Sequence, residues 1–328
     1  MNLDAASPPV QTAPDLQALG PDAQAAFEQR LGRLTQALDI LPDKPEETPA
    51  SALRALWLLA AGRPMSLHAA AETPLVALSA AQLEALDGLI ERRVAGEPIA
   101  YLTGWQRFMG LELRASPEAL IPRAESELLG QIAAQKLRSM AEATATPPIV
   151  IDVCCGSGNL ALALAHAVPQ AQVHGADISQ TAIDLARANT QNLDLGQRVS
   201  LHTGDLLAPF GAEFQGKVDL VVSLPPYIST AKMDTMPHEI VGHEPHLAFD
   251  GGPFGVRILM RLIREAPPLL RPGGWLGMEV GLGQGPAMMQ LLEKHPAYDR
   301  VETVCDAQGA VRAVLARAAG SIADWVVG

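Results

Sequence analysis

The chain has 328 residues, of which 48% are hydrophobic, so it can bury one large core or two ordinary ones. Its formal net charge of −12 argues against a broad surface for nucleic-acid phosphates. No apolar run reaches the roughly 18–20 residues of a membrane span, and the N-terminus lacks the pattern of a signal peptide. The three cysteines do not form a disulfide framework. We therefore expect a cytoplasmic protein without membrane contact and without an extended nucleic-acid surface.

The first third of the chain predicts a tail followed by helices. Residues 1–21 are rich in Ala, Pro, Gln and Asp and show no sustained period, which is typical of a disordered tail. Residues 22–96 repeat apolar side chains at helical spacing, and Ser79 is a candidate N-cap within them. One such apolar face consists of Leu53, Leu56, Trp57 and Ala60. We expect a small helical domain that covers a site or binds a partner and carries no catalysis.

A segment of changed character follows at 97–127. Residues 97–108 carry mixed turn and strand signals, and residues 109–114 can form a hairpin arm. Arg123 lies close in sequence to Glu125 and Glu127. This group can be a solvated charge cluster or the ion-paired floor of a pocket, and the sequence alone favours the solvated cluster.

From residue 128 onward strands alternate with helices, after a first apolar helix. Predicted strands span 149–153, 172–177, 199–202, 218–222 and 275–280, with an antiparallel pair at 301–305 and 311–316. Predicted helices span 160–167, 179–191, 256–266 and 286–294. This alternation predicts an α/β fold, a doubly wound and mostly parallel sheet, over residues 128–328.

The fourth predicted strand runs into a stiff loop, Leu224-Pro225-Pro226-Tyr227. Two prolines fix φ near −65° and remove two backbone donors, so the loop is rigid and its carbonyls lack local N–H partners. Tyr227 adds an aromatic face with a polar tip. Such a loop at the carboxyl edge of a sheet suits a small planar group held for reaction. A plain Pro-Pro turn is an equally open alternative.

A glycine turn and a set of acids lie on neighbouring predicted strands. Gly156 and Gly158 follow the first strand, which contains Asp152, and let the backbone approach a ligand closely. Asp177 ends the second strand, where an acid can bind ribose hydroxyls, and Asp205 follows the third. The full dinucleotide fingerprint and the phosphate-binding lysine are missing. An acidic rim of this kind suits a positively charged nucleoside such as S-adenosylmethionine, and three independent caps are the alternative.

Several further motifs occur in order along the chain. They are Pro98-Ile99-Ala100-Tyr101-Leu102-Thr103-Gly104, Ile121-Pro122-Arg123-Ala124-Glu125-Ser126-Glu127, Asp152-Val153-Cys154-Cys155-Gly156-Ser157-Gly158, Glu244-Pro245, Phe249-Asp250-Gly251-Gly252 with Gly255, Leu270 to Trp275, Glu279, and Gly281 to Gly285. With them, residues 50–318 resemble the HemK/PrmC family of protein-glutamine methyltransferases, which modify peptide release factors. The first 50 residues match poorly.

The resemblance implies a helical N-terminal domain joined to a Rossmann-like class I methyltransferase domain. It implies S-adenosylmethionine as cofactor, no metal, and an acceptor site at Leu224, Pro225, Pro226 and Tyr227. The implied cofactor residues are Asp152, Cys154, Gly156, Gly158, Asp177, Ile178, Asp205 and Leu206, with Arg123 and Glu127 at the floor.

One residue departs from the family pattern. The family's acceptor loop is Asn-Pro-Pro-Tyr, and Leu224 stands in place of the asparagine. In the family's logic the asparagine helps to hold the substrate amide, so its loss costs about 1–3 kcal/mol, or one to two decades in rate. We therefore expect a divergent enzyme whose acceptor is either a release factor-like protein or a small molecule that is methylated on nitrogen or oxygen. A non-catalytic protein that only binds the cofactor is a further alternative.

Three histidines follow the acceptor loop. His238, His243 and His246 can act as bases for an acceptor that must lose a proton, such as a hydroxyl. The sequence favours ordinary loop residues over this role, and their spacing alone is weak support for a metal site.

Overall fold

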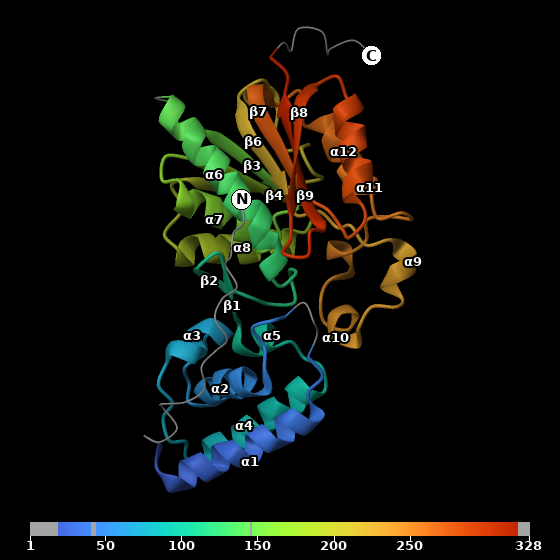
Figure 1. Cartoon of the computed structure of the whole chain (residues 1–328). Helices are drawn as coiled ribbons and strands as arrows, with labels where there is room; N and C mark the ends of the chain where they lie inside the picture. Colours follow the sequence, from blue (N-terminus) through green and yellow to red (C-terminus); the bar gives the residue numbers. More distant parts are fainter. Residues whose placement is uncertain (1–18, 41–43, 145, 321–328) are drawn as a thin grey trace. The chain divides into compact units, whose positions relative to one another are not determined.

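The structure is a computed structural model that describes residues 19–40, 44–144 and 146–320 (Figure 1). Almost all of the predicted tail lies outside these residues. The chain divides into two compact units, Met1–Arg107 and Phe108–Gly328. Throughout the described ranges, no helix combines the length and apolar character that crossing a bilayer requires.

The first unit contains helices packed around one apolar cluster. They are α1 (Pro21–Ala37), α2 (Pro49–Ala60), α3 (Leu67–Glu72), α4 (Ala80–Val94) and α5 (Ile99–Thr103). The predicted apolar face of α2 is buried in this cluster. Ser79 forms a capping box at the start of α4, as predicted. The turn and strand signals before residue 104 were misleading, because these residues form α5, which ends at the left-handed Gly104 (φ 77°).

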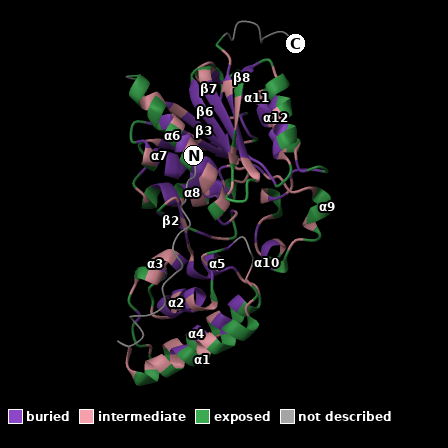
Figure 2. Cartoon of the chain, viewed as in Figure 1, coloured by how far each residue is buried: buried purple, intermediate pink, exposed green. Residues whose placement is uncertain are grey.

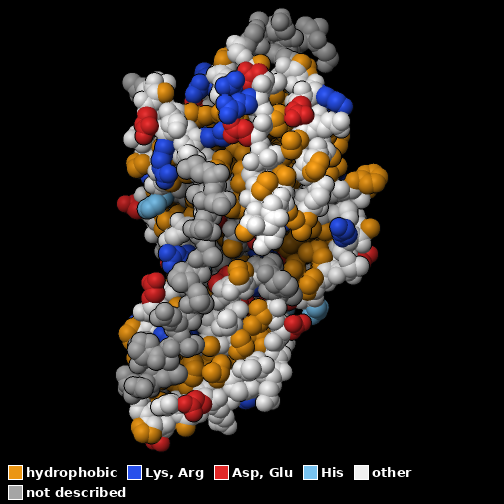
Figure 3. Space-filling view, viewed as in Figure 1, with side chains coloured by type: hydrophobic (Ala, Val, Ile, Leu, Met, Phe, Trp, Pro, Cys, Tyr) orange, Lys and Arg blue, Asp and Glu red, His pale blue; other side chains and the backbone are white. Residues whose placement is uncertain are grey.

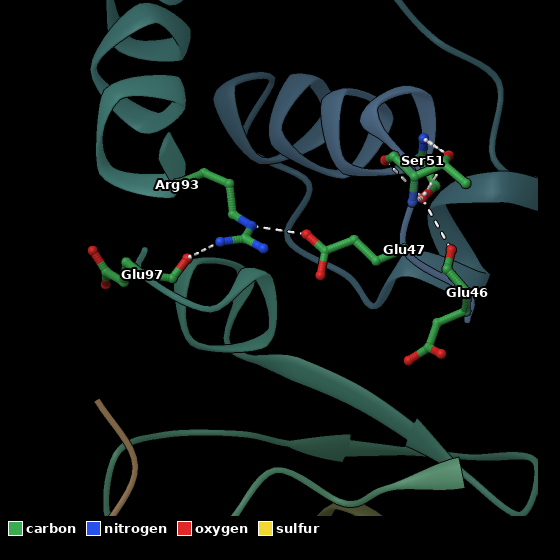
Figure 4. Close-up of polar contacts among 6 residues, drawn as sticks. Glu46, Glu47, Ser51, Arg93 and Glu97 are labelled. Atoms are coloured by element: carbon green, nitrogen blue, oxygen red, sulfur yellow. Dashed lines mark hydrogen bonds and ion pairs between the residues drawn. The ribbon is translucent and has the colours of Figure 1, made fainter. Parts of the chain in front are cut away.

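A buried ion pair fastens the loop before α2 to the end of α4 (Figure 4). Arg93 Nε donates to Glu47 Oε1 at 2.8 Å, and the two side chains are 1% and 0% exposed. Arg93 Nη1 also donates to the backbone carbonyl of Glu97 at 3.4 Å. Because both charges lie away from water, each depends on the other for compensation.

The second unit is built on a seven-stranded sheet in the order β5-β4-β3-β6-β7-β9-β8. The strands are β3 (Ile149–Val153), β4 (Gln172–Asp177), β5 (Val199–Thr203), β6 (Val218–Ser223), β7 (Leu270–Glu279), β8 (Tyr298–Cys305) and β9 (Val311–Ala318). The five strands from β5 to β7 are parallel, and β9 runs antiparallel to β7 and β8. The predicted doubly wound, mostly parallel sheet is therefore confirmed.

Helices cover both faces of this sheet, and the strands are the most buried part of the second unit (Figure 2). Residues of α6 (Glu127–Ala143) and α7 (Asn159–Ala167) belong to the core on one face, with residues that flank α8 (Gln180–Asn192). Residues of α11 (Arg257–Glu265) and α12 (Gly285–Lys294) belong to the core on the other. Short helices α9 (Thr230–Met233) and α10 (His238–Val241) follow β6. Turns of 3-10 helix span 124–126, 212–214 and 246–248.

Two local features differ from a regular strand–helix alternation. The Pro272-Gly273-Gly274 turn lies inside β7, where the register against β6 shifts, because Gly273 adopts φ 76°. Before α6, β1 (Trp105–Phe108) and β2 (Leu111–Arg114) pair, which agrees with the predicted hairpin arm.

Charged side chains of both signs lie side by side near the end of the sheet that carries the start of β8 (Figure 3). Arg300 pairs with Glu302, Arg317 pairs with Asp299, and Lys136 also donates to Glu302. These basic groups are therefore balanced locally by acids.

Candidate active site

The carboxyl ends of the parallel strands bring four sequence motifs to one edge of the sheet. The loops after β3, β4, β5 and β6 contain the glycine turn, Asp177, Asp205 and the Leu224 loop. Direct bonds link neighbouring ends: Gly204 N donates to the Asp177 carbonyl at 2.9 Å, and Ser223 Oγ donates to the Val153 carbonyl at 2.8 Å. This edge is where ligands bind in open α/β sheets.

The turn after β3 has left-handed backbone at three positions and is tightly packed at Gly158. Cys154, Gly156 and Gly158 adopt φ of 59°, 51° and 81°, and Gly158 N donates to the Cys155 carbonyl at 2.7 Å. A Cβ at Gly158 would lie 3.1 Å from the Cβ of Ala186. The turn therefore places backbone, rather than side chains, against whatever binds at this edge.

Asp152 lies beneath the glycine turn and is fully buried. Its Oδ2 accepts from Ala161 N, in the first turn of α7, at 2.9 Å, whereas Oδ1 has no hydrogen-bond partner in the described part of the chain. Burial, the largest effect, raises the pKa of this carboxyl to about 8. Asp152 thus connects α7 to β3 through Oδ2, and its Oδ1 stays available to accept a further hydrogen bond.

Asp177 connects the ends of β3 and β4. Its Oδ2 accepts from Gly156 N and its Oδ1 from Ser179 N, both at 2.9 Å. Burial raises the pKa of Asp177, although these backbone bonds oppose the shift. The next residue, Ile178, is 56% exposed and offers an apolar surface beside the carboxylate.

The third acid is placed differently. Both carboxyl oxygens of Asp205 lie 2.9 Å from Arg261 Nη1, in an ion pair whose acid side chain is 52% exposed. Leu206 is buried and adopts φ 49°. A ligand at this end of the edge therefore meets an acid that already has a cationic partner.

The Leu224 loop presents backbone carbonyls and no polar side chain before Tyr227. Leu224 is half-buried and packs on the core shared with α6 and α7, and Pro225 is buried. Within the described ranges, nothing donates a hydrogen bond to the carbonyls of Leu224, Pro225 or Pro226. The expectation that this loop carries unpaired carbonyls agrees with the structure.

Arg123, predicted at the floor of the site, forms an ion pair with a distant segment. Arg123 Nη2 donates to Glu244 Oε1, and Ile121 N donates to Glu244 Oε2 at 3.1 Å. The Arg123 and Glu244 side chains are 11% and 0% exposed, so the favoured reading of a solvated cluster is wrong. The partner lies 121 residues away, where charge spacing along the sequence gives no signal.

Glu127 does not pair with Arg123. Its Oε1 accepts from Met109 N at 2.6 Å and so holds the turn between β1 and β2, where Met109 adopts φ 47°. A carboxylate bound there stabilises the hairpin rather than a cofactor.

Two polar residues that interact with Tyr227, Glu279 and Gln284, had no predicted role. Glu279, at the end of β7, is buried, and its Oε2 has no hydrogen-bond partner among the described residues. Burial raises the pKa of Glu279, while Ser126 and the Tyr227 hydroxyl interact with its carboxyl and oppose the shift. Gln284 binds the Tyr227 backbone carbonyl. The sequence position of Glu279, an acid at the end of an apolar strand, could have marked it as a candidate site residue.

The three histidines lie on α10 and just after it. The rings of His238 and His243 are 6.2 Å apart, and His246 is exposed. In the described residues, none of the three forms a hydrogen bond with the Leu224–Tyr227 loop, and no cluster could hold a metal ion. Their role as bases stays a prediction.

Comparisons with known proteins match both units. A family model described as PrmC N-terminal domain matches residues 33–104, and one described as Methyltransferase domain matches residues 150–243. A protein of Moorella thermoacetica named release factor glutamine methyltransferase is 40% identical over 227 residues, which cover 69% of this chain and 77% of that protein. This chain belongs to the release factor glutamine methyltransferase family.

Other members of the family extend the match. The proteins of that name from Geobacter sulfurreducens and Caulobacter vibrioides are 38% and 35% identical over 217 and 281 residues. These matches cover 66% and 86% of this chain, and 72% and 93% of the two proteins. The chain is accordingly an S-adenosylmethionine-dependent methyltransferase, as predicted, and the non-catalytic alternative loses its support.

Proposed function

We propose that the edge formed by the glycine turn and Asp177 holds S-adenosylmethionine. The backbone around Gly156 and Gly158 makes room for the methionine part, and the Asp177 carboxylate, already fixed by two backbone donors, binds ribose hydroxyls. Ile178, Asp205 and Leu206 are the residues that would hold the adenine end. The left-handed backbone of the glycine turn and the exposure of Ile178 support this fit.

The bound cofactor supplies an electrophilic methyl group carried on a sulfonium. The part of this chain is to hold the acceptor atom in line with that methyl group and to exclude water. The carbonyls of Leu224, Pro225 and Pro226 are candidates for accepting an N–H or O–H of the acceptor. Tyr227 is the last residue of the loop and supplies its aromatic ring.

The acceptor of this enzyme is a hydroxyl or amine rather than a glutamine amide. The observation that carries this conclusion is Leu224, whose apolar side chain packs on the core and accepts no hydrogen bond. A primary amide presents two N–H groups, and its nitrogen lone pair is delocalised, so it needs firm orientation from both. A loop with no side-chain acceptor suits a better nucleophile that requires less orientation.

A second candidate acceptor is the glutamine of a release factor-like protein. The name of the relatives supports it, and so do the unpaired carbonyls, since two of them can receive both N–H groups of an amide. In that case backbone alone performs what the asparagine side chain contributes elsewhere in the family.

Methyl transfer from labelled S-adenosylmethionine distinguishes the two candidates. Wild-type enzyme is assayed with a bacterial release factor that has an unmodified glutamine, and with a panel of small hydroxyl and amine compounds. We expect slow transfer to the release factor and faster transfer to members of the panel. Fast transfer to the glutamine, with none to the panel, would refute the altered acceptor and establish the second candidate.

A further inference from the structure

The side chain of Gln284 joins three loops at the acceptor end of the site. Its Oε1 accepts from Gly281 N at 2.9 Å. Its Nε2 donates to the carbonyl of Tyr227 at 2.9 Å and to the carbonyl of Gly255 at 3.2 Å. The amide thus uses both of its N–H groups and its oxygen to connect the segment after β7, the acceptor loop and the loop before α11.

Two glycines next to this amide, Gly255 and Gly281, are too closely packed to be replaced by a larger residue. A Cβ at Gly255 would lie 2.3 Å from the Tyr227 carbonyl oxygen, and a Cβ at Gly281 would lie 2.9 Å from Cδ2 of the Tyr227 ring. Gly255 also adopts φ 71°, which a larger residue tolerates poorly. Both glycines therefore allow the Tyr227 backbone to sit where Gln284 can reach it.

This bond holds the Tyr227 end of the acceptor loop, next to the backbone bonds that join Ile228 to Phe249 and Gly251. Pro225 and Pro226 have fixed φ, and Leu224 follows directly on β6, so most of the loop's freedom lies at Tyr227. Burial raises the pKa of the Tyr227 hydroxyl and the interaction of this side chain with Glu279 adds to the shift, while the Tyr227 carbonyl accepts from Gln284. Holding both ends of Tyr227 determines where the unpaired carbonyls before it point.

We propose that Gln284 is a positioning residue that aims the acceptor-loop carbonyls at the methyl acceptor. The inference rests on the proposed function of the Leu224–Tyr227 loop and adds the residue that sets its geometry. An alternative role is purely structural, at the N-cap position of α12, where the Gln284 side chain makes no capping hydrogen bond and its Oε1 holds Gly281 N. The two roles differ in the atom that matters: positioning needs the two N–H groups, whereas the cap needs none of them.

The variant Gln284→Glu separates these roles. A glutamate keeps an oxygen for Gly281 N and the length of the side chain, but it replaces both donors with an acceptor that repels the carbonyls of Tyr227 and Gly255. Gln290→Glu is the matched control, since Gln290 is exposed on the same helix and receives the same charge change. The amount of bound cofactor is measured separately by calorimetry.

For Gln284→Glu we expect kcat/KM for the methyl acceptor to fall about tenfold or more, with the Kd of S-adenosylmethionine within about twofold of the control. Hydrogen exchange of residues 224–230 is expected to rise, whereas that of 286–294 in α12 stays at the control level. Gln284→Asn, which keeps the donors on a shorter stem, is expected to recover part of the loss.

The exchange experiment keeps this inference separate from the proposed function. If wild-type enzyme methylates no acceptor tested, the proposed acceptor chemistry fails, and faster exchange at 224–230 in Gln284→Glu alone supports the positioning role. If exchange and kcat/KM in Gln284→Glu both equal those of Gln290→Glu, the positioning role is overturned. Faster exchange confined to α12 also overturns it, in favour of the helix cap.

Discussion

The substitution Leu224→Asn tests the central feature of the acceptor loop. Leu224 is half-buried against the core, while the carbonyls of Leu224 and Pro225 are unpaired among the described residues. Asparagine adds one side-chain acceptor next to those carbonyls. We expect the variant to gain transfer to a glutamine amide and to lose a little stability.

Both effects follow from the surroundings of Leu224. One satisfied hydrogen bond in a dry site contributes about 1–3 kcal/mol, which corresponds to about a 5- to 100-fold gain in kcat/KM for glutamine. Removing a half-buried leucine costs about 1 kcal/mol, from about 1.5–3 kcal/mol for complete burial. For a unit of this size, that cost lowers Tm by about 2–4 °C.

The assay is transfer of a labelled methyl group to a release factor with a free glutamine, by wild type, Leu224→Asn and Leu224→Ala. The alanine variant loses the same packing and gains no acceptor, so it isolates the new hydrogen bond. The reasoning is refuted if Leu224→Asn is no faster on glutamine than Leu224→Ala, while both bind cofactor like wild type.

Three further changes probe the stability of the first unit and the sheet edge of the second. Glu47→Ala removes the carboxylate that pairs with the buried Arg93 guanidinium, so we expect the free energy of unfolding to fall by about 3–5 kcal/mol. An unchanged midpoint of urea unfolding would contradict a stabilising role of this buried pair. Asp152 has a folded-state pKa of about 8, above the ordinary 3.8, so the folded state binds more protons between these values and wild-type stability falls as pH rises from about 4 to 8. Asp152→Asn stays neutral, and its unfolding free energy relative to wild type should increase from pH 5 to pH 8; an equal or shrinking difference would count against the raised pKa. Gly158→Ala places a Cβ 3.1 Å from Ala186 at φ 81°, so calorimetry should show at least about tenfold weaker cofactor binding, and unchanged affinity would show that the turn adapts.

The strands of the second unit could be predicted from sequence because their local signals are strong. Residues 149–153 form β3 with the predicted bounds, and the predicted antiparallel pair became β8 and β9. Short apolar runs between turn residues, alternating with helical periods, leave few other arrangements. The fifth strand, predicted over residues 275–280, is longer in the structure and begins at Leu270, since a bulge can carry Gly273 and Gly274 without ending the strand.

The parts of the site that depend on pairing between distant residues could not be predicted. Sequence spacing suggested that Arg123 interacts with nearby acids, whereas its partner is Glu244. Charge patterning reads only local neighbours, and burial of both partners is decided by tertiary packing. The three hydrogen bonds of Gln284 could not be predicted for the same reason, since a single polar residue at the start of a helix does not indicate which distant backbone groups it binds.

The pair between Arg123 and Glu244 also sets an order of events during synthesis. Its members are 121 residues apart, so at about 5–20 residues per second the arginine leaves the ribosome on the order of ten seconds before its partner. During that interval β3 to β6 can be made, but the Glu244 carboxylate is not yet available to the guanidinium. The glycine turn can therefore form on the growing chain, whereas the acceptor side of the site is completed only after residue 244 emerges.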